Sequence, residues 1–293
     1  MTIAINTPNG NIGHPLALQL LDAGQKLILL TRSPDKTKSL ADRAATVHEG
    51  DLLDEAFVVH ATKGADVLFW LSPADPRVTD FRGYQDNIAQ ICIKAVTTNK
   101  ISHVMTLSSV GAQLTEGTGP ILGLGILERM LDKTDSKLTH VRPNYFMENL
   151  LQSLDTIAAN GMIYLPFPGS IPFDMIATPD IAKACGERLL EENWDKRTII
   201  ELAGPKSVSH DSAAATIGKA IGKEVQYIEI DDADFKAAMA KYGVSDSASD
   251  VFLEMYDGFK KGTIRHETTP QRTSTTFEWF ATNVIKPAIA SMR

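Results

Sequence analysis

Several features that define other classes of protein are scarce or missing in this chain of 293 residues. It has only two cysteines, Cys92 and Cys185, and each lies in an apolar stretch that predicts a helix. We interpret them as buried thiols in a reducing compartment, because disulfide frameworks need more cysteines. No apolar run approaches the roughly 20 residues that a membrane-spanning helix needs, and no secretory signal precedes the first predicted strand. We therefore expect a cytoplasmic protein that makes no contact with a membrane.

Positive charge is also in short supply. Lys and Arg number 29 against 36 Asp and Glu, which gives a net charge of −7. Nucleic-acid binding needs clustered Lys and Arg, so nucleic acid is not an expected partner. No spacing of Cys, His or acidic residues indicates a metal site. Apolar residues make up 43% of the chain, which is enough for a full hydrophobic core.

The first half of the chain alternates short apolar runs with amphipathic runs. This alternation is typical of a parallel sheet with right-handed helical crossovers. Runs such as 27–30 and 67–71 are continuously apolar, as expected for strands that are covered on both faces. Ser33 is expected to cap the second helix, with Pro34 at its first position. The expected strands are 3–6, 26–31, 45–49, 65–71, 101–107 and 137–142, and the other expected helices are 13–23, 54–61, 79–99 and 120–133.

This pattern predicts an α/β fold, a doubly wound parallel sheet of the Rossmann type with a smaller C-terminal α+β lobe. We expect residues 1–150 to form an NADP-binding domain, completed by elements of 174–204. Residues 151–293 are expected to form the smaller lobe, which faces a substrate or a partner. Segment 161–172 is rich in Pro and Gly and is expected to be a loop with a short strand. The lobe's expected helices are 178–190, 209–221, 233–242, 250–260 and 274–284, and its expected strands are 198–202 and 224–230.

A glycine-containing turn follows the first predicted strand and opens the first predicted helix. Such a turn lets the backbone approach a pyrophosphate that lies at the helix N-terminus. Gly10 is the position of close approach, and Gly13 allows the helix to pack on the strand. The alternative is an ordinary turn, but the position within a run of strand–helix units favours a dinucleotide site. The turn contributes Thr7, Asn9, Gly10, Asn11, Ile12 and Gly13 as candidate cofactor-binding residues.

The end of the second predicted strand favours NADP(H) over NAD(H). An NAD site usually has Asp or Glu there, which binds the ribose hydroxyls. This chain has Thr31-Arg32 instead, with Lys36 about one helical turn further on. The Arg32 guanidinium can bind a 2′-phosphate with two donors, and Lys36 adds positive charge. The alternative is that both side chains are solvated residues at the start of a helix.

Further candidate cofactor-binding residues follow the other predicted strands, because ligands bind at the carboxyl ends of strands in such sheets. Asp51 can accept a hydrogen bond from the adenine amino group, and Ser72-Pro73 is expected along the ribose and nicotinamide. Simple loop polarity explains each of them as well. The set comprises Asp51, Leu52, Leu71, Ser72, Pro73, Ser108, Ser109, Pro143, Asn144 and Tyr145.

With these residues in place, the chain resembles the NmrA-like group of atypical short-chain dehydrogenases/reductases. The matching segments are residues 9–13, 31–36, 49–52, 108–109, Glu128, 142–149 and 178–182. The resemblance implies a Rossmann domain that binds NADP(H) and a small lobe that shapes a cleft. It also implies either a quinone reductase or a regulator that senses the ratio of oxidised to reduced cofactor.

Two departures from the related enzymes matter. The turn begins with Thr7, where the family usually has Gly. The helix after the fifth strand lacks the Tyr-x-x-x-Lys pair of active short-chain dehydrogenases, because Leu124 and Glu128 occupy the equivalent positions. A Tyr-x-x-x-Lys does occur at Tyr256 and Lys260, but we treat it as a chance helical pair in the C-terminal lobe.

The candidate catalytic residues are therefore Ser108 and Tyr145, either of which can supply a proton, as solvent also can. Tyr145 can instead pack under the cofactor. Phe146, Asn149 and Phe167 are candidate substrate-binding residues. Alternatively, the aromatic rings form the lobe's core, and Asn149 caps the following helix. We expect an NADPH-dependent oxidoreductase for a quinone or small carbonyl compound. The alternative is a non-catalytic redox sensor that controls a protein partner.

Overall fold

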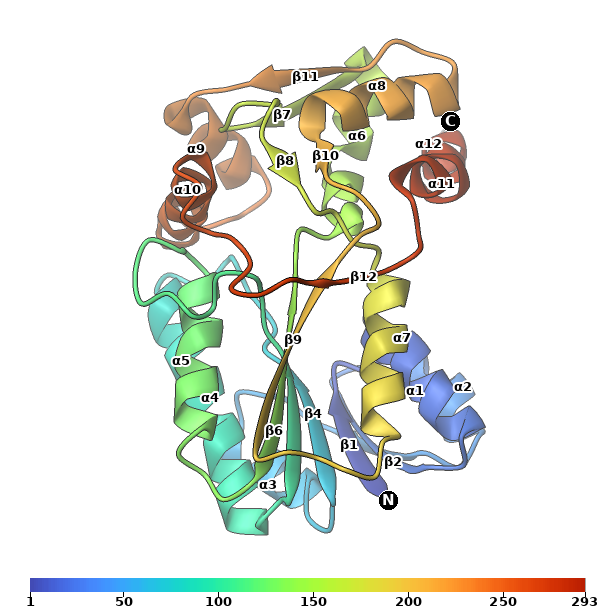
Figure 1. Cartoon of the computed structure of the whole chain (residues 1–293), viewed down its shortest axis with the longest axis vertical. Coiled ribbons are helices and arrows are strands. Elements are labelled where there is room, and N and C mark those ends of the chain that lie inside the picture. Colours follow the sequence, from blue (N-terminus) through green and yellow to red (C-terminus); the bar gives the residue numbers. More distant parts are fainter. Residues whose placement is uncertain (293) are drawn as a thin grey trace.

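Two lobes stack along the long axis of the molecule (Figure 1). The structure is a computed structural model that describes residues 1–292, so Arg293, the last residue of the expected smaller lobe, lies outside the described part. The lower lobe contains an eight-stranded sheet in the order β12-β9-β6-β5-β4-β1-β2-β3, and every neighbouring pair is parallel. The expected doubly wound sheet is therefore confirmed. The strands are β1 (Thr2–Asn6), β2 (Lys26–Thr31), β3 (Thr46–Glu49), β4 (Val67–Leu71), β5 (His103–Leu107), β6 (Lys137–Pro143), β9 (Arg197–Ala203) and β12 (Gln271–Arg272).

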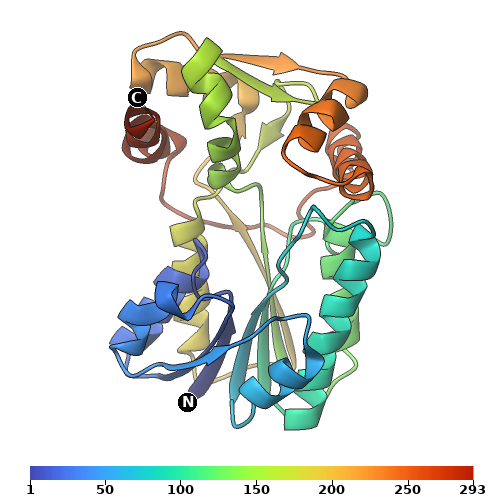
Figure 2. The ribbon, with the colours of Figure 1, turned by 180° about the vertical axis from the view of Figure 1, so that it is seen from behind.

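Helices cover both faces of this sheet (Figures 1 and 2). Successive strand residues point to opposite faces, so an all-apolar strand serves two cores at once. Ile3 and Ile5 pack with Leu16 of α1, whereas Ala4 packs with helices of the opposite face. The first face carries α1 (Gly13–Asp22) and α7 (Thr178–Leu189), and the second carries α3 (Glu55–Ala61), α4 (Phe81–Asn99) and α5 (Ile121–Leu131).

The segment after β2 differs from the expected capped helix. It forms a 3₁₀ turn, η1 (Pro34–Thr37), and then a single α-helical turn, α2 (Lys38–Ala41). The Ser33 side chain makes no capping hydrogen bond within the described residues. Its backbone N–H instead donates to Thr31 Oγ1 at 3.0 Å, and the Thr37 hydroxyl donates to the Pro34 carbonyl at 2.7 Å. These local bonds favour a tight turn over a capped helix.

The upper lobe has two small sheets and the remaining helices. Strand β7 pairs with β11 in parallel, and β8 pairs with β10 antiparallel. Within residues 1–292, none of the helices combines the length and the apolar character that a membrane crossing requires. The lobe's elements are η2 (Met147–Ser153), α6 (Leu154–Asn160), β7 (Met162–Leu165), β8 (Pro172–Phe173), β10 (Val208–Ser209), α8 (His210–Ile221), β11 (Gln226–Glu229), α9 (Asp232–Lys241), α10 (Asp246–Lys260), α11 (Phe277–Phe280), η3 (Ala281–Ile285) and α12 (Lys286–Ser291).

The expected end of the last helix at residue 284 was wrong. The helical path continues through the π-helical turn η3 into α12, which ends at Ser291. Pro287 stands near the start of α12. Proline cannot donate the backbone hydrogen bond of a helix interior, but the wider turn before it lets the chain continue. Ile285 and Ile289 are buried, so packing against the lobe favours this continuation.

A strap formed by residues 264–276 links α10 to α11 and adds β12 to the edge of the large sheet between the two lobes (Figure 1). The Glu201 carboxylate accepts hydrogen bonds from the backbone N–H groups of Glu267 at 2.9 Å and Thr268 at 2.6 Å. Arg142 donates to Glu128 at 3.0 Å and to Glu267 at 2.8 Å. The strap is therefore attached to β6 by the buried Arg142 and to β9 by the buried Glu201, and it joins the upper lobe to the sheet.

Candidate functional site

The candidate cofactor site lies at the carboxyl edge of the large sheet, where β1 and β4 separate. These strands pair only from Ile3 to Ile5. Beyond that point the buried Asn6 side chain connects β1 to the end of β4. It donates to the Leu71 carbonyl and accepts from the Leu71 N–H, both at 2.8 Å. The crevice at this reversal of strand order is where α/β sheets bind ligands. Sequence analysis missed Asn6, although a polar residue that ends an apolar strand is a usable signal.

All the predicted cofactor-binding residues lie on strand ends or loops at this one edge, because they follow parallel strands. They are Thr7, Asn9, Gly10, Asn11, Ile12, Gly13, Arg32, Lys36, Asp51, Leu52, Leu71, Ser72, Pro73, Ser108, Ser109, Pro143, Asn144 and Tyr145. Among them, Gly10, Asn11, Arg32, Lys36 and Asp51 are exposed, whereas Ile12 and Pro143 are buried. The topology therefore gathers candidates that the sequence leaves far apart.

The turn after β1 is shaped by Thr7 and by two glycines with different surroundings. Thr7 has a φ of 54°, in the left-handed region that glycine usually occupies. Its carbonyl accepts a hydrogen bond from the Gly10 N–H at 3.1 Å. A Cβ on Gly13 would collide with that carbonyl, whereas a Cβ on Gly10 would lie at an ordinary 3.5 Å from it. Gly13 is thus needed for packing, and Gly10 keeps the exposed side of the turn open.

Asn9 connects this turn to the end of β2. Its side-chain amide donates to Thr31 Oγ1 at 2.9 Å and to the Ser33 carbonyl at 3.3 Å. The exposed Arg32 lies between those two acceptors in the chain. Asn9 therefore holds the backbone segment that carries Arg32 against the glycine turn.

Arg32 also lies near the loop that follows β4. The pKa of Asp75 is lowered, first by its hydrogen bonds with Arg77 and further by the positive charge of Arg32. Burial raises the pKa of Tyr84, and the charges of Asp75, Arg32 and Asp51 also act on this phenol. Sequence analysis missed Tyr84, because nothing in the pattern of α4 distinguishes it from other half-buried helix residues.

Two hydroxyls at this edge lack internal partners. Ser108 is 5% exposed, and neither its Oγ nor the Oγ1 of Thr7 has a hydrogen-bond partner among residues 1–292. Buried hydroxyls without partners are unfavourable by about 1–3 kcal/mol. Both lie where a dinucleotide would supply phosphate, ribose or amide groups. These residues therefore fit the cofactor that the fold implies.

Tyr145 and its neighbours lie where β6 enters the upper lobe. The Tyr145 N–H donates to Asn144 Oδ1 at 2.7 Å, and its ring packs on Phe173 at 5.1 Å between centroids. Burial raises the pKa of Tyr145 well above its ordinary value, and Asn149 hydrogen bonds to this side chain. Asn149 lies inside η2, and Ser153 precedes α6, so the alternative in which Asn149 caps the following helix is wrong. Phe146 is only partly buried.

The position of Phe167 does not fit its predicted role in contacting a substrate. It is fully buried, with Tyr256 stacked on it at 5.1 Å and His210 perpendicular to it at 4.9 Å. A ring in this position cannot contact a ligand unless the lobe rearranges. The structure therefore favours the other interpretation, in which Phe167 belongs to the lobe's core.

His210 lies in a box of aromatic rings. Tyr145, Phe167, Phe173 and Tyr227 surround it at centroid distances of 4.9–5.5 Å. Neither ring nitrogen has a hydrogen-bond partner in the described chain. Burial lowers the pKa of His210 from 6.5 to about 3. The imidazole is therefore neutral near pH 7, and it packs perpendicular to the ring of Tyr145.

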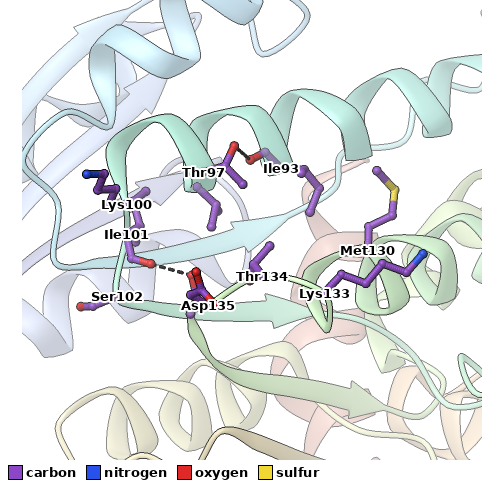
Figure 3. Close-up of a pocket in the computed structure, with 11 residues that line it drawn as sticks. Ile93, Thr97, Lys100, Ile101, Ser102, Met130, Lys133, Thr134 and Asp135 are labelled. Carbon is purple, nitrogen blue, oxygen red and sulfur yellow. Dashed lines mark hydrogen bonds between the residues drawn. The ribbon is translucent and has the colours of Figure 1, made fainter.

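A separate groove lies at the opposite edge of the sheet, between the C-terminal ends of α4 and α5 (Figure 3). It encloses about 780 Å³ and is lined by residues such as Ile93, Lys100 and Met130. The Thr97 and Ser136 hydroxyls on its wall already donate to backbone carbonyls. None of the predicted site residues lines this groove.

The sheet order, the glycine turn at the strand reversal and the orphan hydroxyls define a Rossmann-fold protein of the dinucleotide-binding class. The NmrA-like family model matches residues 1–279. The chain belongs to the NmrA-like family, as the resemblance implied.

Two relatives and one solved structure illustrate the likeness. The chain is 26% identical over 247 residues to NAD(P)H azoreductase of Xenophilus azovorans, which covers 84% of this chain and 83% of the relative. It is also 26% identical over 268 residues to quinone oxidoreductase 2 of Escherichia coli, which covers 89% and 88%. The structure of an Escherichia coli NADPH-dependent quinone oxidoreductase complexed with NADPH has a TM-score of 0.77 at 22% identity, covering 99% of each chain.

Proposed function

We propose that this protein is an NADPH-dependent oxidoreductase that reduces a quinone or a small carbonyl compound. The observation that carries the proposal is the glycine turn at the strand reversal, with Arg32 held beside it by Asn9. The names of the two relatives, an NAD(P)H azoreductase and a quinone oxidoreductase, support this reaction class.

The cofactor-binding residues divide by the part of the dinucleotide that each would hold. The turn from Thr7 to Gly13 would hold the pyrophosphate, because it lies at the N-terminus of α1, where the helix dipole favours an anion. Arg32 and Lys36 would bind the 2′-phosphate, and Asp51 and Leu52 would contact the adenine. The nicotinamide half would lie along Leu71, Ser72, Pro73, Ser108, Ser109, Pro143, Asn144 and Tyr145.

When bound, reduced nicotinamide supplies a hydride, which carries two electrons and one proton. A quinone then needs one further proton to become a hydroquinone. Ser108 is a candidate proton source through its unpaired hydroxyl, and Tyr145 is a candidate through its neutral phenol. The partly exposed Phe146 and Asn149 would orient the substrate. The upper lobe and strap would exclude water from the reaction.

Steady-state oxidation of NADPH with a panel of quinones tests this proposal. We expect turnover that depends on both the quinone and the protein, with NADPH used in preference to NADH. The competing function is a redox sensor without catalysis, which the missing Tyr-x-x-x-Lys of α5 favours. Tight NADP⁺ binding without turnover, together with a protein captured only in one redox state, would establish that alternative.

We also propose a cytoplasmic location. Cys92 and Cys185 are free and buried, and the chemistry needs a compartment that maintains NADPH. Fractionation of cells that express a tagged chain tests this location, and recovery outside the cytosolic fraction would contradict it.

A further inference from the structure

The sheet edge offers few groups that can stabilise the oxygen of a reduced substrate, because Leu124 replaces the usual tyrosine of α5. Tyr256 of α10 occupies a place that supplies one. We propose that Tyr256 is a catalytic residue that faces the substrate together with Tyr145 and donates a hydrogen bond to the substrate's developing oxyanion. This inference rests on the proposed function and adds a residue to it. It assigns a role to the Tyr256 phenol alone, so Tyr256 and Lys260 remain a chance pair.

Helix α10 belongs to the upper lobe, yet it is anchored on loops of the cofactor edge. Just before α10, the Ser245 N–H donates to the Pro76 carbonyl at 2.8 Å. The Phe81 N–H, at the start of α4, donates to Ser247 Oγ at 3.1 Å. Both partners belong to the segment that follows β4. The N-terminal half of α10 is therefore fixed beside the loop expected to lie along the nicotinamide.

The loop after β5 holds the other half of α10. Gly119 lies so close to the Val251 carbonyl that a Cβ there would collide with it. Met255 packs with Val110 and Ile264 in a small apolar cluster. Val110 follows Ser108 by two residues, so the helix segment that carries Tyr256 is packed against the loop of the orphan hydroxyl.

A continuous row of rings connects Tyr256 to Tyr145. Tyr256 stacks on Phe167 at 5.1 Å with an interplanar angle of 28°. Phe167 contacts Phe173 at 5.5 Å, and Phe173 contacts Tyr145 at 5.1 Å. Both tyrosines are only partly buried. The row thus links the two phenols through Phe167 and Phe173, with Tyr145 at the carboxyl end of β6.

Tyr145 lies within electrostatic range of Tyr256. The pKa of Tyr145 is raised first by burial and then by its neighbours Tyr256 and Tyr227. Burial raises the pKa of Tyr256 to about 12. Both phenols therefore keep their protons near pH 7 and act as hydrogen-bond donors. Lys260 is exposed, and burial is the cause that raises the Tyr256 pKa, so the pair does not act as a Tyr–Lys dyad.

The chemistry balances without an additional reactant. Hydride addition to a quinone forms the hydroquinone monoanion, and a proton from Ser108, Tyr145 or solvent completes the hydroquinone. Tyr256 keeps its proton throughout and stabilises the anionic oxygen by a hydrogen bond that is stronger in the transition state than in the ground state. Removal of one such donor typically lowers kcat about 100-fold or more.

The test compares Tyr256→Phe with the wild type, using 2-methyl-1,4-naphthoquinone and NADPH. Phenylalanine keeps the ring on Phe167, so the fold should persist. We expect kcat to fall about 100-fold while KM and NADPH affinity change little. Tyr242→Phe removes a phenol that is 65% exposed, and Lys260→Ala tests the dyad. Both controls should retain wild-type kcat.

The outcomes separate the inference from the proposed function. A wild type that does not oxidise NADPH with quinones overturns the proposed function, and the inference with it. An active wild type with an equally active Tyr256→Phe overturns the inference alone. A loss in Lys260→Ala as large as that in Tyr256→Phe also overturns it, because the phenol would then work through the lysine.

Discussion

Selectivity for the cofactor is determined at the scale of single residues, at the end of β2. No carboxylate follows Thr31 directly, and the exposed Arg32 takes that place. Asn9 donates to the Thr31 hydroxyl on one side of Arg32 and to the Ser33 carbonyl on the other. A phosphate that binds beside this turn would therefore contact a side chain whose backbone segment is already ordered. This order lowers the entropy lost on binding.

Replacement of Arg32 by Ala should weaken NADPH binding about 10- to 100-fold, because hydrogen bonds to charged groups contribute about 1.5–3 kcal/mol. NADH binding should change little, since it lacks the 2′-phosphate. Calorimetric titration of both nucleotides measures the difference. Arg43→Ala is the matched control, because Arg43 pairs with Asp22 of α1 instead. Equal losses for NADPH and NADH would contradict the 2′-phosphate assignment.

Substitution of Gly10 should affect nucleotide binding, whereas substitution of Gly13 should affect thermal stability. Gly10→Val should abolish binding of both nucleotides while thermal stability stays near that of the wild type, because Gly10 is exposed and its Cβ direction is open. Gly13→Val should lower Tm instead, because its side chain would collide with the Thr7 carbonyl. Thermal unfolding and nucleotide titration of both variants measure this contrast. Normal nucleotide affinity in Gly10→Val would refute the pyrophosphate position.

At the scale of elements, the strap depends on a cation buried in β6. Arg142 and Glu128 are each 2% exposed, whereas Glu267 of the strap is 48% exposed. A buried charge that loses its partner is strongly unfavourable. We therefore assign Glu128, which matches the family pattern, a structural role as the buried partner of Arg142 and no role in hydride transfer.

Glu128→Gln should lower the free energy of unfolding by about 3–5 kcal/mol, the usual effect of breaking a buried ion pair. Glu267→Gln should cost about 1 kcal/mol or less, because the Glu267 carboxylate is itself half-exposed and Arg142 keeps its buried partner Glu128. Urea denaturation of the two variants compares them directly. Similar losses in both would show that the strap contact, rather than burial, determines the stability of this cluster.

Acid stability is a property of the whole molecule, and desolvated histidines contribute to it. Desolvation is the leading cause that lowers the pKa of His103 and His140 as well as that of His210. For His210, the unfolded chain takes up a proton below pH 6.5, but the folded chain does so only near pH 3. The unfolded state therefore binds more protons in this window, so the free energy of unfolding falls as the pH falls from about 6.5 towards 3.

His210→Phe should flatten this decline, because a phenyl ring fits the aromatic box and does not titrate. His60→Gln, at an exposed position of α3, serves as the control and should leave the profile unchanged. Urea midpoints measured between pH 7 and 4 give the slopes. An unaltered slope in His210→Phe would show that His210 is protonated in the folded state at mildly acidic pH.

Much of the sheet and of the cofactor edge follows from local sequence. Continuously apolar runs predicted β1, β2 and β4 because both faces of those strands are covered. The glycine turn was predictable because its geometry involves only a few consecutive residues. The π-helical turn before Pro287 was not, since the burial of Ile285 and Ile289 on the lobe outweighs the local cost of proline.

The sequence by itself determined the class of fold and the polarity of the cofactor edge, because strand alternation, turn chemistry and the basic residue after β2 depend on neighbours in the chain. Only the tertiary structure decided that Phe167 is core, that Arg142 is neutralised by α5 and the strap, and that Tyr256 stacks on Phe167. These outcomes depend on contacts between segments far apart in the chain. Such contacts are selected by the packing of whole lobes, and no local pattern encodes them.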